Sequence, residues 1–167
     1  MPSGRTHAVI TSAAAFSLTV AAPAYVPAHG LSSLAIIPGC ALGVLLTPDL
    51  DVPGPTYSVY QIRRLAGKAE HFAVFLWRLL WLPYARLIPH RSYWSHFPVF
   101  STLLRLAYLL LPLFGLLLGL WFSSFVTGPV FPMSQVTGWL LHSTWLSWAF
   151  AGLVISDSLH WLFDLIF

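Results

Sequence analysis

The sequence predicts an all-α integral membrane protein, in which residues 1–167 form a single membrane domain: a helical bundle of about four spans plus an interfacial helix. Of the 167 residues, 57% are hydrophobic and 8% are charged, whereas soluble domains are about 45–50% apolar and about 25% charged. Residues 106–126 include no Asp, Glu, Lys, Arg or His, and a helix of that length crosses about 30 Å of hydrocarbon. Eight Trp, six Tyr and twelve Phe suit the aromatic belts at membrane surfaces.

The first two predicted spans form a hairpin over residues 8–25 and 31–47. The first is rich in small residues, and the second reads LSSLAIIPGCALGVLLT. Two prolines and a glycine between residues 22 and 30 interrupt the helical pattern and predict the turn. Arg5, an alanine-rich run and AAPAYVPA also resemble a secretory signal peptide with a small-residue cleavage site. Whether the first segment is retained therefore stays open.

The segment 48–101 is predicted to stay on one side of the membrane. Within it, FAVFLWRLLWLPYARLIPH mixes leucines and aromatic residues with Arg78 and Arg86. An arginine at the centre of a membrane span costs about 2.5–3.5 kcal/mol on insertion scales. We therefore expect this stretch to lie in the interface, with its arginines reaching toward the headgroups.

The third and fourth spans are predicted over residues 102–126 and 136–156, with Gly128, Pro129 and Pro132 in the turn between them. All eight Lys and Arg precede the first span, lie between the second and third, or fall at the start of the third. The positive-inside rule then predicts that both termini and the central segment are cytoplasmic. The basic charge needs no nucleic-acid partner, and no nucleic-acid-binding motif is present.

Histidine and aspartate residues gather at the cytoplasmic ends of the predicted spans. The candidate metal ligands are His7, Asp49, Asp51, His90, His96, Asp157, His160 and Asp164. Asp157, His160 and Asp164 share one helical face, but their α-carbons extend over about 10 Å. The two acids are therefore not expected to hold one ion together. Either His160 pairs with one of them while the other supports the site, or the site holds two ions.

The donor set favours a divalent transition metal. Histidine nitrogen and carboxylate oxygen without thiolate suit Zn²⁺ best, with Mn²⁺ or Fe²⁺ as alternatives. The single Cys40 lies inside an apolar run. Such ions polarise a phosphoryl or carbonyl oxygen and lower the pKa of bound water toward about 7. Arg91, directly after His90, is predicted to act in the catalytic site by pairing with a substrate phosphate.

Four motifs in order resemble a known family: RTH, TPDLD, IPHRSYWSH and SDSLHWLFD. The chain resembles the YdjM-like family of predicted membrane-bound metal-dependent hydrolases. It looks most like the cyanobacterial branch, described as metal-binding proteins of unknown function. The resemblance covers nearly the whole chain and implies that the eight candidate residues are ligands. It also implies a bacterial inner membrane, plasma or thylakoid. Two departures stand out: Ser92 replaces a glycine that is common after His-Arg, and Ala8 replaces an acid that is common after the first histidine.

The leading functional prediction is a metal-dependent hydrolase that acts on a phosphoester or lipid-like substrate at the cytoplasmic membrane face. Membrane lipid is the expected surrounding partner. The alternative is a small non-catalytic subunit of a larger membrane complex, with a structural metal or polar cluster. A metal transporter ranks last, because its acids would be expected near the membrane midplane.

Overall fold

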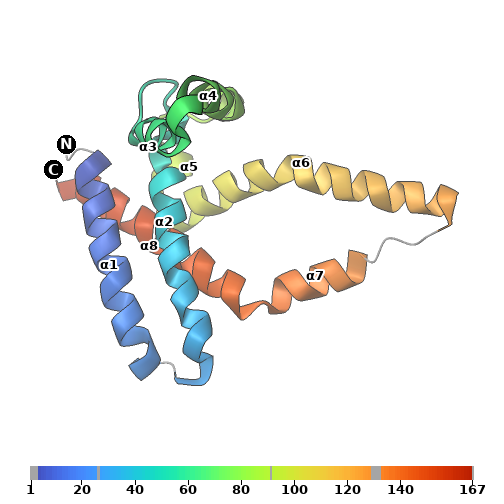
Figure 1. The fold of residues 1–167 in the computed structure, drawn as a ribbon, viewed down its shortest axis with the longest axis horizontal. Helices are drawn as coiled ribbons and strands as arrows, with labels where there is room; N and C mark the ends of the chain where they lie inside the picture. The colour runs from blue at the N-terminus through green and yellow to red at the C-terminus, as the bar shows by residue number, and fades with distance from the viewer. Residues whose placement is uncertain (1–3, 26, 91, 129–132, 167) are drawn as a thin grey trace.

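The computed structural model describes residues 4–25, 27–90, 92–128 and 133–166, and within these the chain is all-α. The α-helices are α1 (Gly4–Tyr25), α2 (Ile36–Leu45), α3 (Tyr57–Ala66), α4 (Glu70–Leu87), α5 (Tyr93–His96), α6 (Pro98–Thr127), α7 (Met133–His142) and α8 (Thr144–Ile166). Short 3-10 helices are η1 (Pro27–Ala35), η2 (Pro48–Asp51) and η3 (Gly67–Ala69). Helices α1, α2 and α8 lie side by side, and α6 extends away from them (Figure 1).

Three segments of the described chain are long and apolar enough to cross a membrane: Leu31–Asp51, Pro98–Val126 and Thr144–Ile166. The predicted membrane character is therefore confirmed in its coarse form, and the predicted spans 31–47 and 102–126 fall inside the first two segments. Helix α1 has 22 residues, which correspond to about 33 Å of helix, but a fourth span over 8–25 stays a prediction.

The third segment, Thr144–Ile166, differs from the predicted fourth span, 136–156, because the chain leaves the helix between α7 and α8. The hydroxyl of Ser143 accepts a hydrogen bond from the backbone N–H of Leu146 at 3.4 Å and so caps the start of α8. Helix α8 then continues to Ile166. Asp157, His160 and Asp164 consequently lie within one unbroken helix.

Glycines set the close approach of α2 and α8. A Cβ atom on Gly39 would overlap the carbonyl oxygen of Ala149, and one on Gly152 would overlap that of Ile36. Nearby, the thiol of the buried Cys40 donates a hydrogen bond to the carbonyl of Gly152 at 3.3 Å. This contact fixes the relative position of the two helices that carry most of the polar residues described below.

Gly152→Ala is therefore expected to lower the stability of the protein by about 1–3 kcal/mol, because the added methyl group forces two backbones apart. Thermal unfolding in detergent measures this effect. Gly119→Ala is the matched control, since a Cβ atom on Gly119 of α6 meets nothing within 4 Å. Equal melting temperatures for the two variants would contradict the packing described.

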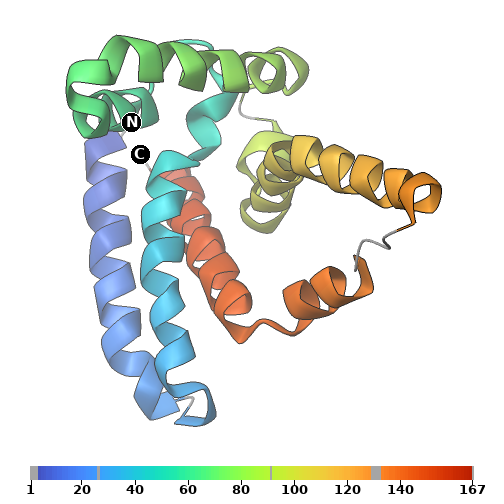
Figure 2. The ribbon, with the colours of Figure 1, turned by 45° about the vertical axis from the view of Figure 1, so that its right-hand side comes forward.

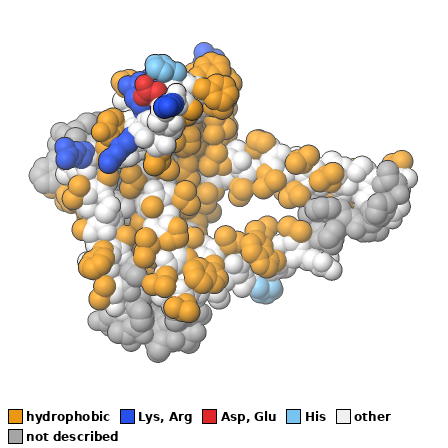
Figure 3. Space-filling view, in the orientation of Figure 1, with side chains coloured by type: hydrophobic (Ala, Val, Ile, Leu, Met, Phe, Trp, Pro, Cys, Tyr) orange, Lys and Arg blue, Asp and Glu red, His pale blue; other side chains and the backbone are white. Residues whose placement is uncertain are grey.

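Helices α3 and α4 lie across the end of the bundle at which both termini are found (Figure 2). The turn η2 connects them to the bundle, because Leu50 packs in a buried cluster with Trp81 and Tyr84 of α4. Tyr108 of α6 packs on the same cluster and donates a hydrogen bond to the carbonyl of Leu80. In contrast, much of α6 leaves its leucine and phenylalanine side chains exposed (Figure 3).

Candidate metal centre

Most of the predicted ligands meet at the end of the bundle near both termini. Their donor atoms form three groups, within each of which they lie within 4.8 Å of one another. The groups are His7–His160–Asp164, Asp49–His96–His160 and Asp51–His90–His96. Because His160 and His96 each belong to two groups, the three groups form one continuous cluster of seven residues, called here the donor cluster.

The turn η2 supplies both acids of the TPDLD motif. Pro48 begins the turn, and the hydroxyl of Thr47 accepts a hydrogen bond from the backbone N–H of Asp49 at 3.5 Å. The chain has thus left the α-helix before Asp49, which is the condition under which residues 49 and 51 can project together. Asp51 is buried, whereas the side chain of Asp49 is 31% exposed to solvent. Asp49 is therefore the more accessible acid.

The short helix α5 orients the second histidine motif. Ser92 caps it by accepting a hydrogen bond from the backbone N–H of Ser95 at 3.3 Å. The hydroxyl of Ser95 lies 2.8 Å from Nδ1 of His96, and Nδ1 of His90 lies 2.7 Å from Oδ1 of Asp51. His90 thus precedes α5, and His96 ends it directly before α6.

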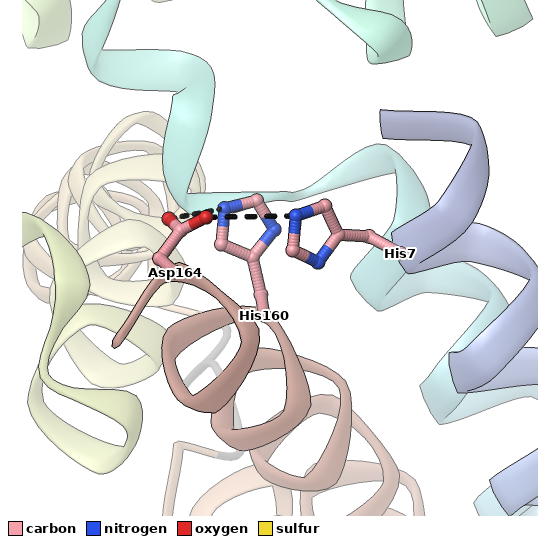
Figure 4. Close-up of side chains that lie close together, drawn as sticks. All are labelled: His7, His160 and Asp164. Atoms are coloured by element: carbon pink, nitrogen blue, oxygen red, sulfur yellow. Dashed lines mark ion pairs between the residues drawn. The ribbon is translucent and has the colours of Figure 1, made fainter. Parts of the chain in front are cut away.

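Helices α1 and α8 supply the remaining donors (Figure 4). Nε2 of His160 lies 3.3 Å from Oδ2 of Asp164, and Nε2 of His7 lies 3.6 Å from Oδ1 of the same carboxylate. The two imidazole rings stack with centroids 4.1 Å apart. Nε2 of His160 is also 3.6 Å from Oδ1 of Asp49, so this nitrogen faces carboxylates from two different elements.

Each of these three distances fits a pair of metal ligands better than a simple ion pair. Charge-assisted N–H···O hydrogen bonds are about 2.7–2.9 Å long. Two atoms that each lie about 2.0–2.2 Å from a tetrahedral zinc ion are about 3.3–3.6 Å apart. The separations around His160, Asp164, His7 and Asp49 fall in this second range.

A buried imidazole nitrogen supports the same conclusion. Nε2 of His96 is buried and has no hydrogen-bond partner among the described residues. Burial lowers the pKa of His96 and that of His7 below the ordinary value of 6.5, which favours the neutral ring that binds metals. Since Ser95 occupies the Nδ1 side of His96, the buried Nε2 is the atom left for an ion. The residues present therefore fit a divalent metal.

Asp157 is the predicted ligand that the described structure does not bring into the donor cluster. Its Oδ2 atom accepts hydrogen bonds from the guanidinium of Arg105 and the hydroxyl of Thr102, both on α6. Both charged side chains are almost fully buried, with residue exposures of 1% for Asp157 and 2% for Arg105. On α8, His160 therefore lies beside Asp164, whereas Asp157 is directed to Arg105 and Thr102 of α6.

Arg105 was not predicted to take part in the site. The available signal was an arginine one turn inside an otherwise apolar span, because such a charge needs an acid from a neighbouring helix. Arg91, predicted to bind a substrate phosphate, lies outside the described residues.

A comparison with known families agrees with metal binding by the donor cluster. The profile of a family described as "Uncharacterized metal-binding protein (DUF2227)" matches residues 2–167. No curated protein and no solved structure shows a significant match to the chain.

Proposed function

Because the chain belongs to this family of uncharacterized metal-binding proteins, we propose that it is a membrane-embedded metal-dependent hydrolase acting on a phosphoester or lipid-like substrate. The donor cluster is the observation that carries the proposal. Seven histidine and aspartate side chains from α1, η2, α5 with its preceding turn, and α8 converge there without a thiolate. The motif resemblance to predicted membrane-bound hydrolases supports the choice of a hydrolytic reaction.

One or two divalent ions would be held by the donor cluster, with zinc preferred over manganese or iron. The side around His160 offers His7, Asp49 and Asp164, and the other side offers Asp51 and His90. His96 lies between the two sides. A bound ion of this kind polarises a phosphoryl oxygen and makes water a better nucleophile at neutral pH.

Arginines beside the donor cluster support an anionic substrate. Arg5, Arg64, Tyr57 and Tyr60 line an open cavity of about 420 Å³. Tyr57 also lines the small cavity that includes His7, Asp49 and His160. A phosphate bound by the two arginines would therefore sit next to the donor cluster, with Asp49 as its most accessible acid. Arg91 stays a proposed second contact to the phosphate.

The proposed placement has the donor cluster at the cytoplasmic face of a bacterial inner membrane. The positive-inside rule supports this side, because Lys and Arg lie on the segments at that end of the spans. In this placement residues 8–25 of α1 form an additional span, and α4 lies in the interface across the end of the bundle.

Removal of the two arginines tests the substrate class. The variant Arg5→Ala/Arg64→Ala is expected to lower kcat/KM for a phosphoester lipid by at least about 100-fold, because each of the two charged hydrogen bonds is worth about 1.5–3 kcal/mol. Metal content should not change. Lys68→Ala is the matched control, since Lys68 is an exposed cation on the same side of the molecule. Carboxyl-ester hydrolysis without phosphoester hydrolysis would contradict the proposal.

A non-catalytic subunit of a larger complex is the second candidate, and the exposed surface of α6 favours it. This helix leaves many large apolar side chains uncovered along its length, which suits either lipid or a partner helix. A protein that binds metal, hydrolyses none of the phosphoesters tested and co-purifies with a larger complex would favour this candidate.

A further inference from the structure

We propose that the cavity between α3 and α4 binds an anionic phospholipid, whose acyl chain enters the apolar interior while its phosphate contacts Arg63 and Arg78. This lipid site is separate from the donor cluster. It is proposed whether or not the protein hydrolyses a phosphoester.

The cavity has the size and lining of a ligand site. Its volume is about 480 Å³, within the range of about 300–1,000 Å³ that is typical for small-molecule sites. The loop after η2, helix α3 and helix α4 form its walls. Apolar side chains dominate them, among them Leu50, Val59, Val74, Trp77 and Trp81. Such walls accept an acyl chain and would leave the polar groups of a peptide unpaired.

Two arginines from different helices line the same cavity. Arg63 of α3 lies 3.6 Å from the carboxylate of Glu70 through Nε, so part of its charge is already balanced. Arg78 of α4 has no ion pair with any described residue. Helices α3 and α4 with η3 between them carry five Lys and Arg against the single acid Glu70, and positive side chains gather over them (Figure 3). This charge is complementary to a lipid phosphate.

The surface around the cavity indicates a lipid as the source of that phosphate. Helix α4 exposes Phe72, Phe75, Leu76, Leu79 and Leu80 beside its arginines. Exposed apolar and basic side chains on one helix, next to membrane-length segments, are typical of an interfacial helix. A soluble phosphate would bind the arginines but would leave the apolar interior unused.

The occupant would also contact the turn η2, which carries two acids of the donor cluster. Leu50 lines the cavity and stands between Asp49 and Asp51 in η2. A lipid packed against Leu50 would therefore support the turn that carries two acids of the donor cluster.

Native mass spectrometry of the detergent-purified protein with phosphatidylglycerol or phosphatidylcholine of identical chains tests the inference. We expect the wild type to bind phosphatidylglycerol at least about tenfold more tightly, because each arginine near the headgroup is worth about 1 kcal/mol. Arg63→Ala/Arg78→Ala should abolish the preference. Ala85→Phe, which narrows the cavity at a lining position, should weaken binding of both lipids.

Arg86→Ala is the matched control, because Arg86 is exposed on the same helix and does not line the cavity. An equal loss in this variant, or equal binding of both lipids by the wild type, would overturn the inference. Full competition by millimolar inorganic phosphate would also overturn it and would indicate a soluble anion. Metal content, measured on the same samples, separates the two proposals: lipid preference in a protein without metal would leave this inference intact and contradict only the proposed hydrolase.

Discussion

His96→Ala and His160→Ala are each expected to lower the metal content by at least about half, because each imidazole belongs to two of the three donor groups and its removal leaves only one group complete. The wild type should carry about one or two equivalents of a transition metal. Elemental mass spectrometry on detergent-purified protein measures the loss. Circular dichroism of the same samples shows whether the helices are retained.

The controls for this prediction come from histidines that belong to no donor group. His71 and His142 are exposed, so His71→Ala and His142→Ala should keep the full metal content. Ser95→Ala should weaken metal binding by about 10–100-fold without abolishing it, because Ser95 orients the ring of His96. Unchanged metal content in both His96→Ala and His160→Ala would contradict the metal centre.

Asp157→Ala is expected to destabilise the protein by about 3–5 kcal/mol, because it leaves the guanidinium of Arg105 buried without its carboxylate. The effect should be larger than that of most single substitutions, whose typical cost is about 0.5–3 kcal/mol. Thermal or denaturant unfolding in detergent measures it.

The double variant Asp157→Leu/Arg105→Leu separates a packing role from a ligand role. Removing both charges together should recover most of the lost stability, because a buried ion pair can often be replaced by apolar side chains at little cost. The double variant should also keep its metal. A stable Asp157→Ala variant that loses its metal would instead make Asp157 a ligand.

The local pattern of the sequence was enough to predict the membrane-length segments. Hydropathy is a sum over neighbouring residues, so the run at 106–126 identified α6 without any knowledge of its neighbours. The averaged hydropathy did not reveal the break at Ser143. A single cap hydrogen bond there changes the path of the chain, while the average hydropathy stays high. The bounds of α8 were therefore the least accurate part of the predicted fold.

The sequence by itself also determined which residue types are available for the site. Histidine and aspartate recur near the same ends of the predicted spans, and this pattern was sufficient to name all seven members of the donor cluster. Only the tertiary structure decided which residues face one another. The rotation and spacing of α2 and α8 depend on contacts such as Gly39 with Ala149, and the position of α6 directs Asp157 to Arg105 and away from His160. Which side chains contact one another depends on distances of a few ångströms between helices that are far apart in the sequence. Hydropathy averaged over neighbouring residues carries no information on these distances.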